Sequence, residues 1–195
     1  MTKIKITEAL IIYAMIVSLL MFFASTKINA QNQLKFGTQK QIIIENFDDG
    51  SVNLTSYPNE DEDPNDWELN SSNTYENSPW SLRIFGNTWK VQNISPILVD
   101  TGDVWQVSAY IASKAEIQGF ALMDATNELR YSFAGSEEVN IAEWVPVYQG
   151  CFDEDQWNDY QLPVADDWLA FFGYLPEITD IVYINDKDGT SQGVV

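Results

Sequence analysis

The sequence predicts an all-β domain, a β-sandwich or barrel. From residue 80 onward, short segments that alternate apolar and polar side chains follow one another with little helical periodicity between them. Turn-forming residues such as Thr101-Gly102-Asp103 and Asp124 to Asn127 separate most of these segments at short intervals. Many short strands separated by such turns are typical of β-sandwiches and β-barrels. No segment repeats as a solenoid or propeller would require.

Residues 1–30 are predicted to be a secretory signal peptide. Two lysines precede an uncharged apolar run from Ala9 to Phe23, and small residues follow it. That run is shorter than the roughly 20 apolar residues of a permanent membrane span, so an uncleaved anchor is the weaker alternative. Residues 31–40 then read as a short spacer and residues 41–195 as the β domain. We expect a secreted or cell-surface protein without a stable membrane span after cleavage.

The strongly negative charge of the chain disfavours partners that carry phosphate groups. It carries 10 basic and 29 acidic residues. The predicted signal peptide holds three of the lysines and one of the glutamates, which leaves 7 basic and 28 acidic residues and a net charge of −21. Nucleic acid and anionic lipid are poor partners, because phosphate binding needs a basic face. The acidity favours solubility in a salty exterior, or a set of carboxylates that holds calcium.

Cysteine and histidine usage narrows the possible chemistry further. Cys151 is the only cysteine, so no internal disulfide forms, and the chain contains no histidine. Ser-His and Cys-His nucleophile pairs, the usual zinc ligand sets and the commonest general base are therefore excluded. An enzyme built from this chain would depend on carboxylates, tyrosine or lysine.

The predicted strands can be placed by their residues. Gly86-Asn87 predicts a tight turn that makes a hairpin of the strands on either side. The apolar run from Trp168 to Tyr174 reads as a loop, and Gly193 to Val195 reads as the opening of a further strand, so the natural protein is expected to continue. The predicted strands cover residues 41–47, a short stretch around Trp67, 80–85, 88–92, 104–111, 116–123, 129–133, 143–149, 157–162 and 178–184.

Aromatic residues are the strongest indication of function, because the chain has 7 Trp, 9 Tyr and 10 Phe. An indole face stacks on the C–H patch of a sugar ring, although for any single Trp a place in the core is the commoner role. In the strand over residues 143–149, Val145 and Val147 take the inward phase. This phase turns Trp144 and Tyr148 outward, and we expect these two side chains to form a flat sugar-binding platform.

Three further side chains are candidates for the same site. Leu82 and Ile84 take the inward phase of their strand and leave Arg83 outward, where it would meet a sugar hydroxyl or a uronic-acid carboxylate. A structural salt bridge of Arg83 is the alternative in so acidic a chain. Trp89 and Trp168 lie near predicted turns, where they would line the rim of a cleft or cap the core.

Two acidic turns are candidate calcium sites. Asp48 and Asp49 precede Gly50, and Asp186 and Asp188 precede Gly189, so each turn places side-chain oxygens close together beside a glycine. Neither turn has the full EF-hand spacing, and Asp-Gly is also a common hairpin turn.

A group of these features resembles a known family. They are Ile44 to Gly50, Trp67, the Ser81-Leu82-Arg83-Ile84 strand with Gly86 to Trp89, Trp105-Gln106-Val107, and Ile181 to Asp186 followed by Gly193 to Val195. Together they look like secreted carbohydrate-binding modules with a galactose-binding-domain-like jelly roll. The resemblance implies a jelly-roll sandwich and a structural calcium at Asp48 or Asp49. It also implies a bacterial surface context, often beside further domains of the same polypeptide.

Three functions follow as hypotheses. The leading one is a non-catalytic module that binds a polysaccharide through exposed aromatic side chains. The second is a structural or adhesive surface domain whose partner is another protein, and burial of Trp144 would favour it over a platform at that residue. The third is a carboxylate-dependent polysaccharide hydrolase or lyase, which needs two acids, or an acid and a tyrosine, that converge in a cleft.

Overall fold

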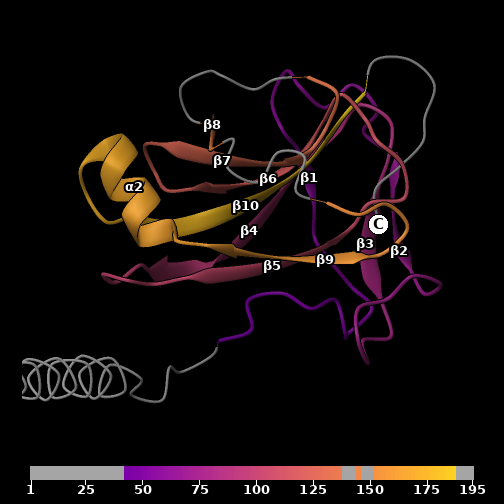
Figure 1. The fold of residues 1–195 in the computed structure, drawn as a ribbon, viewed down its shortest axis with the longest axis horizontal. Helices are drawn as coiled ribbons and strands as arrows, with labels where there is room; N and C mark the ends of the chain where they lie inside the picture. The colour runs from indigo at the N-terminus through magenta and orange to yellow at the C-terminus, as the bar shows by residue number, and fades with distance from the viewer. Residues whose placement is uncertain (1–41, 138–143, 146–151, 188–195) are drawn as a thin grey trace, which may run out of the picture. The chain divides into compact units, whose positions relative to one another are not determined.

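The computed structural model describes residues 42–137, 144–145 and 152–187 of the chain (Figure 1). Within them the protein is all-β, with one short helix, and its sheets are consistent with the predicted β-sandwich. The fold described below is that of the unit that starts at Ile44. Its strands are β1 (Thr55–Ser56), β2 (Trp67–Asn70), β3 (Ser81–Ile84), β4 (Thr88–Leu98), β5 (Trp105–Tyr110), β6 (Ile117–Met123), β7 (Glu128–Ala134), β8 (Trp144–Val145), β9 (Trp157–Leu162) and β10 (Glu177–Asp186), and its helix is α2 (Val164–Phe172).

The strands form one large sheet and two small ones. The large sheet has the order β1-β4-β10-β6-β7-β8, while β2 pairs with β3 and β5 pairs with β9. All of these pairs are antiparallel except the parallel pair of β7 and β8. β10 is a central strand, because it pairs with β4 on one side and with β6 on the other.

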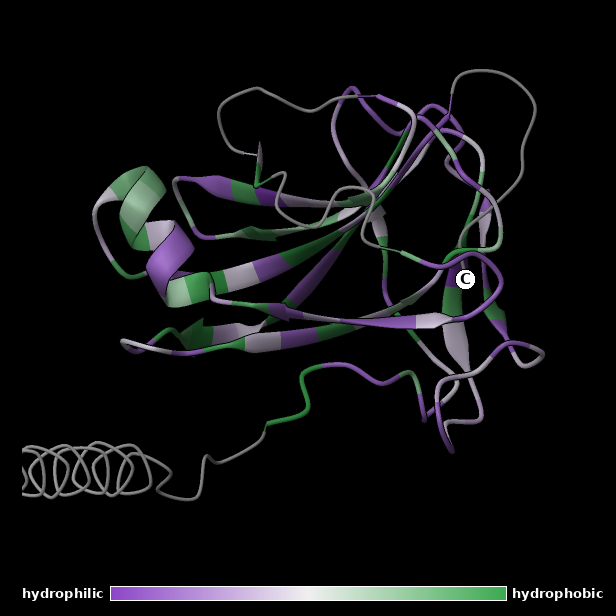
Figure 2. Ribbon diagram, in the orientation of Figure 1, coloured by the Kyte–Doolittle hydropathy of each residue, from purple (hydrophilic) through white to green (hydrophobic). Residues whose placement is uncertain are grey.

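The main core lies between the large sheet and the β5–β9 pair. Apolar and polar residues alternate along the strands, as the bands in Figure 2 show, and β5, β6, β7, β9 and β10 each present an apolar face to this core. Phe133 of β7 stacks on Tyr160 of β9 with ring centroids 4.1 Å apart. Trp105, Val107 and Ala109 of β5 pack against the same core, as their phase predicted. The opposite faces of β5 and β9 are therefore turned away from the core.

Most of the predicted strands are confirmed with shifts of one or two residues at their ends, but the strand predicted over residues 88–92 continues to Leu98. Most of the strand predicted over residues 143–149 lies outside the described residues. The prediction of a strand over residues 41–47 is wrong for its described part, since Ile42 to Phe47 form no strand. The Glu45 carboxylate accepts hydrogen bonds from the backbone N–H groups of Asn46 and Phe47, and Phe47 has a φ of 58°. Such local side-chain bonds and a left-handed backbone are incompatible with an extended ladder.

The predicted hairpin around Gly86-Asn87 is also wrong. The turn is present, but β3 pairs with β2 and β4 pairs with β1 and β10, so the chain changes sheets there. The segment between β1 and β2, residues 57–66, is rich in Asp and Glu, and we call it the acidic loop. It fixes this turn, because Asp63 accepts a hydrogen bond from the Asn87 N–H at 2.7 Å and the Asp66 carbonyl accepts one from the Phe85 N–H. Long-range contacts therefore override the local hairpin signal.

The run from Trp168 to Tyr174, predicted as a loop, lies largely in helix α2. Asp166 and Asp167 occupy the first helical turn, where the helix dipole favours negative charge. Gly173 ends the helix with a φ of 80° and donates its N–H to the Leu169 carbonyl. The helix covers the core with Trp168, whose side chain is fully buried.

A buried ion pair anchors the acidic loop to the large sheet. Lys90 of β4 pairs with Asp61, and the exposed fractions of the two side chains are 3% and 1%. The Lys90 ammonium also donates to the Pro64 carbonyl at 2.8 Å, and Asp61 accepts the Trp89 N–H at 3.1 Å. A charge buried to this extent is tolerated only where such partners surround it.

Candidate functional site

Trp144, the centre of the predicted platform, is buried. Its strand phase is as predicted, because Val145 packs in the main core and Trp144 lies on the opposite face of the large sheet. Its exposed fraction is only 3%, however, so the prediction that its ring faces solvent is wrong. Strand phase shows which face a side chain occupies but not whether that face is covered. Tyr148, the other half of the platform, lies outside the described residues.

Trp144 belongs instead to an aromatic cluster around an arginine. The Arg130 guanidinium lies 5.3 to 5.8 Å from the ring centroids of Tyr57, Trp89 and Trp144. The Trp89 and Trp144 rings meet edge to face at 6.3 Å. The structure thus brings these two predicted site residues together, but the Arg130 guanidinium lies against both rings.

Hydrogen bonds join the polar groups of this cluster to one another. Glu128 accepts hydrogen bonds from Arg130 Nε and from the Tyr57 hydroxyl, both at 2.6 Å. Burial acts to lower the pKa of Arg130, but the hydrogen bond and charge of Glu128 outweigh it and raise that pKa. Burial and Glu128 likewise raise the pKa of Tyr57. Glu128, the Tyr57 hydroxyl and two nitrogens of the Arg130 guanidinium are paired within the cluster, which indicates a structural role.

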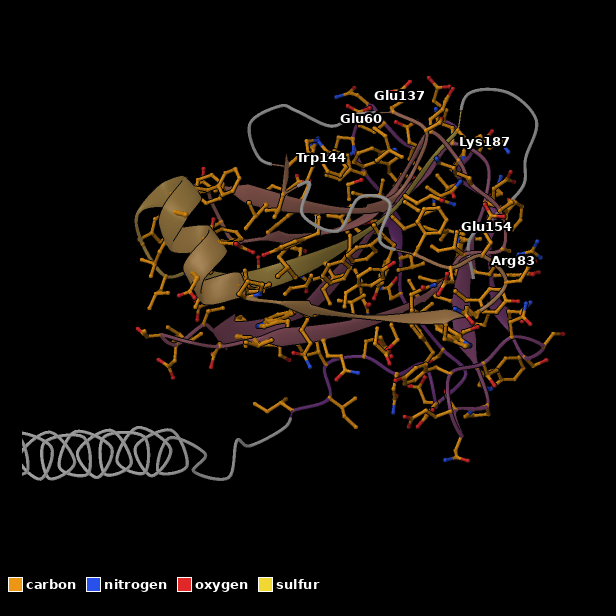
Figure 3. The ribbon with its side chains drawn as sticks, in the orientation of Figure 1. Glu60, Arg83, Glu137, Trp144, Glu154 and Lys187 are labelled. Atoms are coloured by element: carbon orange, nitrogen blue, oxygen red, sulfur yellow. The ribbon has the colours of Figure 1, made fainter. Side chains whose placement is uncertain are left out.

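The remaining predicted ligand-binding residues lie elsewhere. Arg83 of β3 forms a salt bridge with Glu68 at 2.9 Å, as the structural alternative for this residue predicted. Its guanidinium also lies over the Phe85 ring. Figure 3 shows Arg83 and Trp144 well apart, so they do not share one binding surface. Trp168 is fully buried in α2 and caps the core, so it does not line a cleft rim.

The described parts of the calcium turns do not form a ligand set. Asp48 accepts hydrogen bonds from Ser78 Oγ and Asn46 Nδ2, and Asp49 accepts one from the Ser51 N–H. Asp186 ends β10, and Asp188 lies outside the described residues. Among the residues that the structure describes, no three His, Cys, Asp or Glu side chains converge as a metal site. Calcium at these turns stays a prediction.

The outer face of the β5–β9 pair carries a different set of aromatic side chains, which we call the β5–β9 strip: Tyr75, Tyr110 and Trp157. Tyr110 of β5 lies opposite Trp157 of β9 in the ladder, and their ring centroids are 5.9 Å apart. Tyr75, from the loop between β2 and β3, places its ring 5.3 Å from that of Trp157. All three side chains are partly exposed.

Polar side chains adjoin the strip. Ser108 donates a hydrogen bond to Asp159 at 2.6 Å directly across the ladder, and the Tyr75 hydroxyl hydrogen-bonds both residues. The Ser108 hydrogen bond lowers the pKa of Tyr75, but burial and Asp159 outweigh it and leave that pKa raised. The next cross-strand pair consists of the exposed amides Gln106 and Gln161. The strip therefore combines ring faces with hydroxyl, carboxylate and amide groups.

The sequence contains part of the signal for this strip. The phase that places Trp105, Val107 and Ala109 in the core leaves Tyr110 on the other face, and the same rule applied to residues 157–162 leaves Trp157 outward. Tyr75 gives no such signal, because it lies in an irregular loop that only the folded chain brings to the two strands.

Comparison with known protein families and with curated proteins finds no match for this chain. Within the described part of the chain, no helix is long and apolar enough to cross a membrane.

Proposed function

We propose that this protein is a secreted, non-catalytic module that binds a polysaccharide through the β5–β9 strip. The observation that supports it is the set of three partly exposed rings beside the Ser108–Asp159 pair, on the face of the sheet turned away from the core. Ring faces provide stacking for the apolar side of a sugar, and the polar groups provide partners for its hydroxyls.

The ring angles favour a particular form of the ligand. The Trp157 ring lies at 69° to Tyr75 and at 67° to Tyr110. A flat crystalline polysaccharide surface would require coplanar rings, whereas rings tilted in this way offer faces in different directions. The strip therefore suits a single soluble glycan chain that bends or twists across it.

The protonation of the strip suits binding rather than catalysis. A tyrosine hydroxyl is neutral at physiological pH at its ordinary pKa, and the pKa of Tyr75 is raised, so this hydroxyl serves as a hydrogen-bond donor. A hydrolase or lyase would need a residue poised to exchange a proton near neutral pH. The proposal accordingly assigns the strip no chemical step.

A ring deletion tests the proposal. Trp157→Ala removes the ring that both tyrosines contact, so we expect affinity for a binding polysaccharide to fall about 10- to 100-fold. The measurement is intrinsic tryptophan fluorescence titrated with soluble neutral and acidic polysaccharides, with isothermal titration calorimetry on those that bind. Phe171→Ala is the matched control, because it removes an exposed ring of α2 outside the strip and should leave the affinity unchanged. Full affinity in Trp157→Ala would contradict the proposal.

A second candidate is a structural or adhesive domain that binds a protein partner. Burial of Trp144 favours it, and so do large apolar side chains that remain exposed around α2 and the turn between β4 and β5. These are Leu98, Val104, Leu169, Phe171 and Tyr174, with exposed fractions from 37% to 70%. If no polysaccharide changes the fluorescence of the wild-type protein, this candidate takes first place.

Calcium is a separate prediction of the same proposal. A structural ion at Asp48 or Asp49 would stabilise the folded state, so a chelator should lower the melting temperature. The melting temperature is measured by differential scanning calorimetry in calcium and in EGTA. Asp48→Asn should abolish the difference, while Glu62→Gln, a change of the same size in another loop, should preserve it. Identical melting curves in calcium and EGTA would remove calcium from the proposal.

A further inference from the structure

We infer that the β5–β9 strip selects uncharged polysaccharides and rejects acidic ones. This inference rests on the proposed function and adds the charge class of the ligand. It is supported by the negative charge around the strip and by the ion pairs that hold three of the five described basic side chains.

Acidic side chains lie beside the strip in space or close to it along the chain. Asp159 lies within the polar group of the strip, and the charge of Glu76 acts on the neighbouring Tyr75 hydroxyl. On the other side, the Asp155 N–H bonds to the Ile111 carbonyl, next to Tyr110. The residues before β9 add further acids, because Asp153 and Glu154 are both exposed. A ligand on the strip is therefore in a strongly negative potential.

Basic side chains do not offset these acids. The described residues include five, and three of them are held in ion pairs: Arg83 with Glu68, Lys90 with Asp61, and Arg130 with Glu128. Lys187 follows β10, which belongs to the large sheet. Lys114, four residues after Tyr110, is the nearest described base along the chain. The acids named above outnumber it five to one.

The energetic consequence differs for the two ligand classes. A uronic acid or sulfate on the strip would lose part of its hydration and would be repelled by the acids, while three of the five described bases are already held in ion pairs. A neutral sugar meets no such penalty, since its hydroxyls donate to Asp159 and to the amides of Gln106 and Gln161. Repulsion would also recur at every residue of a uniformly acidic chain.

Pairs of glycans with the same backbone but different charge provide the test. A soluble mixed-linkage β-glucan and a galactomannan are each compared with the same polymer after its primary alcohols have been oxidised to carboxylates. By calorimetry we expect the oxidised form of a binding polymer to bind at least about 10-fold more weakly at low salt. The difference in affinity between the two forms, which we call the gap, should become smaller in about 0.5 M NaCl, because screening weakens repulsion between exposed charges.

A charge-removing variant separates repulsion from loss of a hydroxyl contact. Glu154→Gln with Asp155→Asn removes two acids beside the strip, and asparagine tolerates the left-handed backbone of position 155 (φ 59°). This variant should bind the neutral polymer as the wild type does and should narrow the gap. Equal or tighter binding of the oxidised polymer, or a gap unchanged by both salt and the variant, would overturn this inference and leave the proposed function standing. Binding of neither member of any pair would overturn the proposed function.

Discussion

Lys90→Met is expected to destabilise the fold by about 3–5 kcal/mol, the usual cost of removing one partner of a buried ion pair. The substitution keeps the length of the side chain but leaves the Asp61 carboxylate, 1% exposed, without its cation. The acidic loop would also lose the bond from Lys90 to the Pro64 carbonyl. Urea denaturation followed by circular dichroism gives the free energy of unfolding.

Two further variants test whether burial of the ion pair causes the large loss of stability expected for Lys90→Met. Arg83→Met breaks a salt bridge whose side chains are 37% and 47% exposed, so it should cost less than about 1 kcal/mol. Adding Asp61→Asn to Lys90→Met removes the unpaired charge and retains an acceptor for the Trp89 N–H, so it should recover much of the lost stability. Equal costs for Lys90→Met and Arg83→Met would contradict the role assigned to the buried pair.

Trp168→Ala is expected to cost about 3–5 kcal/mol, because it leaves a large cavity between α2 and the core. The indole is fully buried and packs against Phe172 with ring centroids 5.0 Å apart. Leu169, the next residue of α2, offers a comparison because its side chain is 39% exposed. Leu169→Ala should therefore cost only about 1 kcal/mol. Thermal and urea unfolding of the variants give the two values.

The conservative change Trp168→Phe tests whether volume is what matters. Trp168 Nε1 has no hydrogen-bond partner within the described residues, so a phenylalanine loses packing volume and no hydrogen bond. We expect a cost of about 1–2 kcal/mol, well below that of alanine. A Trp168→Phe protein as unstable as Trp168→Ala would show that the indole has a polar role that this packing does not explain.

The sequence predicts the local features of this fold better than its long-range pairing. Alternation placed β5, β6, β7, β9 and β10 because each strand has one face in the main core. The Gly86-Asn87 turn was also predictable, but β4 pairs with β1 and with β10, and β10 lies about ninety residues further on. No local pattern specifies a partner at that distance, so the predicted hairpin was wrong.

The candidate site shows the same limit. Period-two reasoning placed Trp144 on the correct face but could not show that Arg130, Trp89 and Tyr57 pack around it. Helix α2 was missed although Asp166, Asp167 and Gly173 are ordinary helix boundary signals. The apolar run that starts at Trp168 is too short for its pattern to distinguish a loop, a strand and a helix. Tyr75 was beyond prediction, since its place in the strip depends on how an irregular loop folds back.

Burial of Lys90 has a consequence for chemical labelling. An acylating dye must reach a primary amine to react with it, and the Lys90 amine is not reachable while it is paired with Asp61 inside the fold. Modification of Lys90 therefore requires the segment around Asp61 to open first. Its acylation rate, followed by peptide mass spectrometry, would report how often that segment opens in the intact protein.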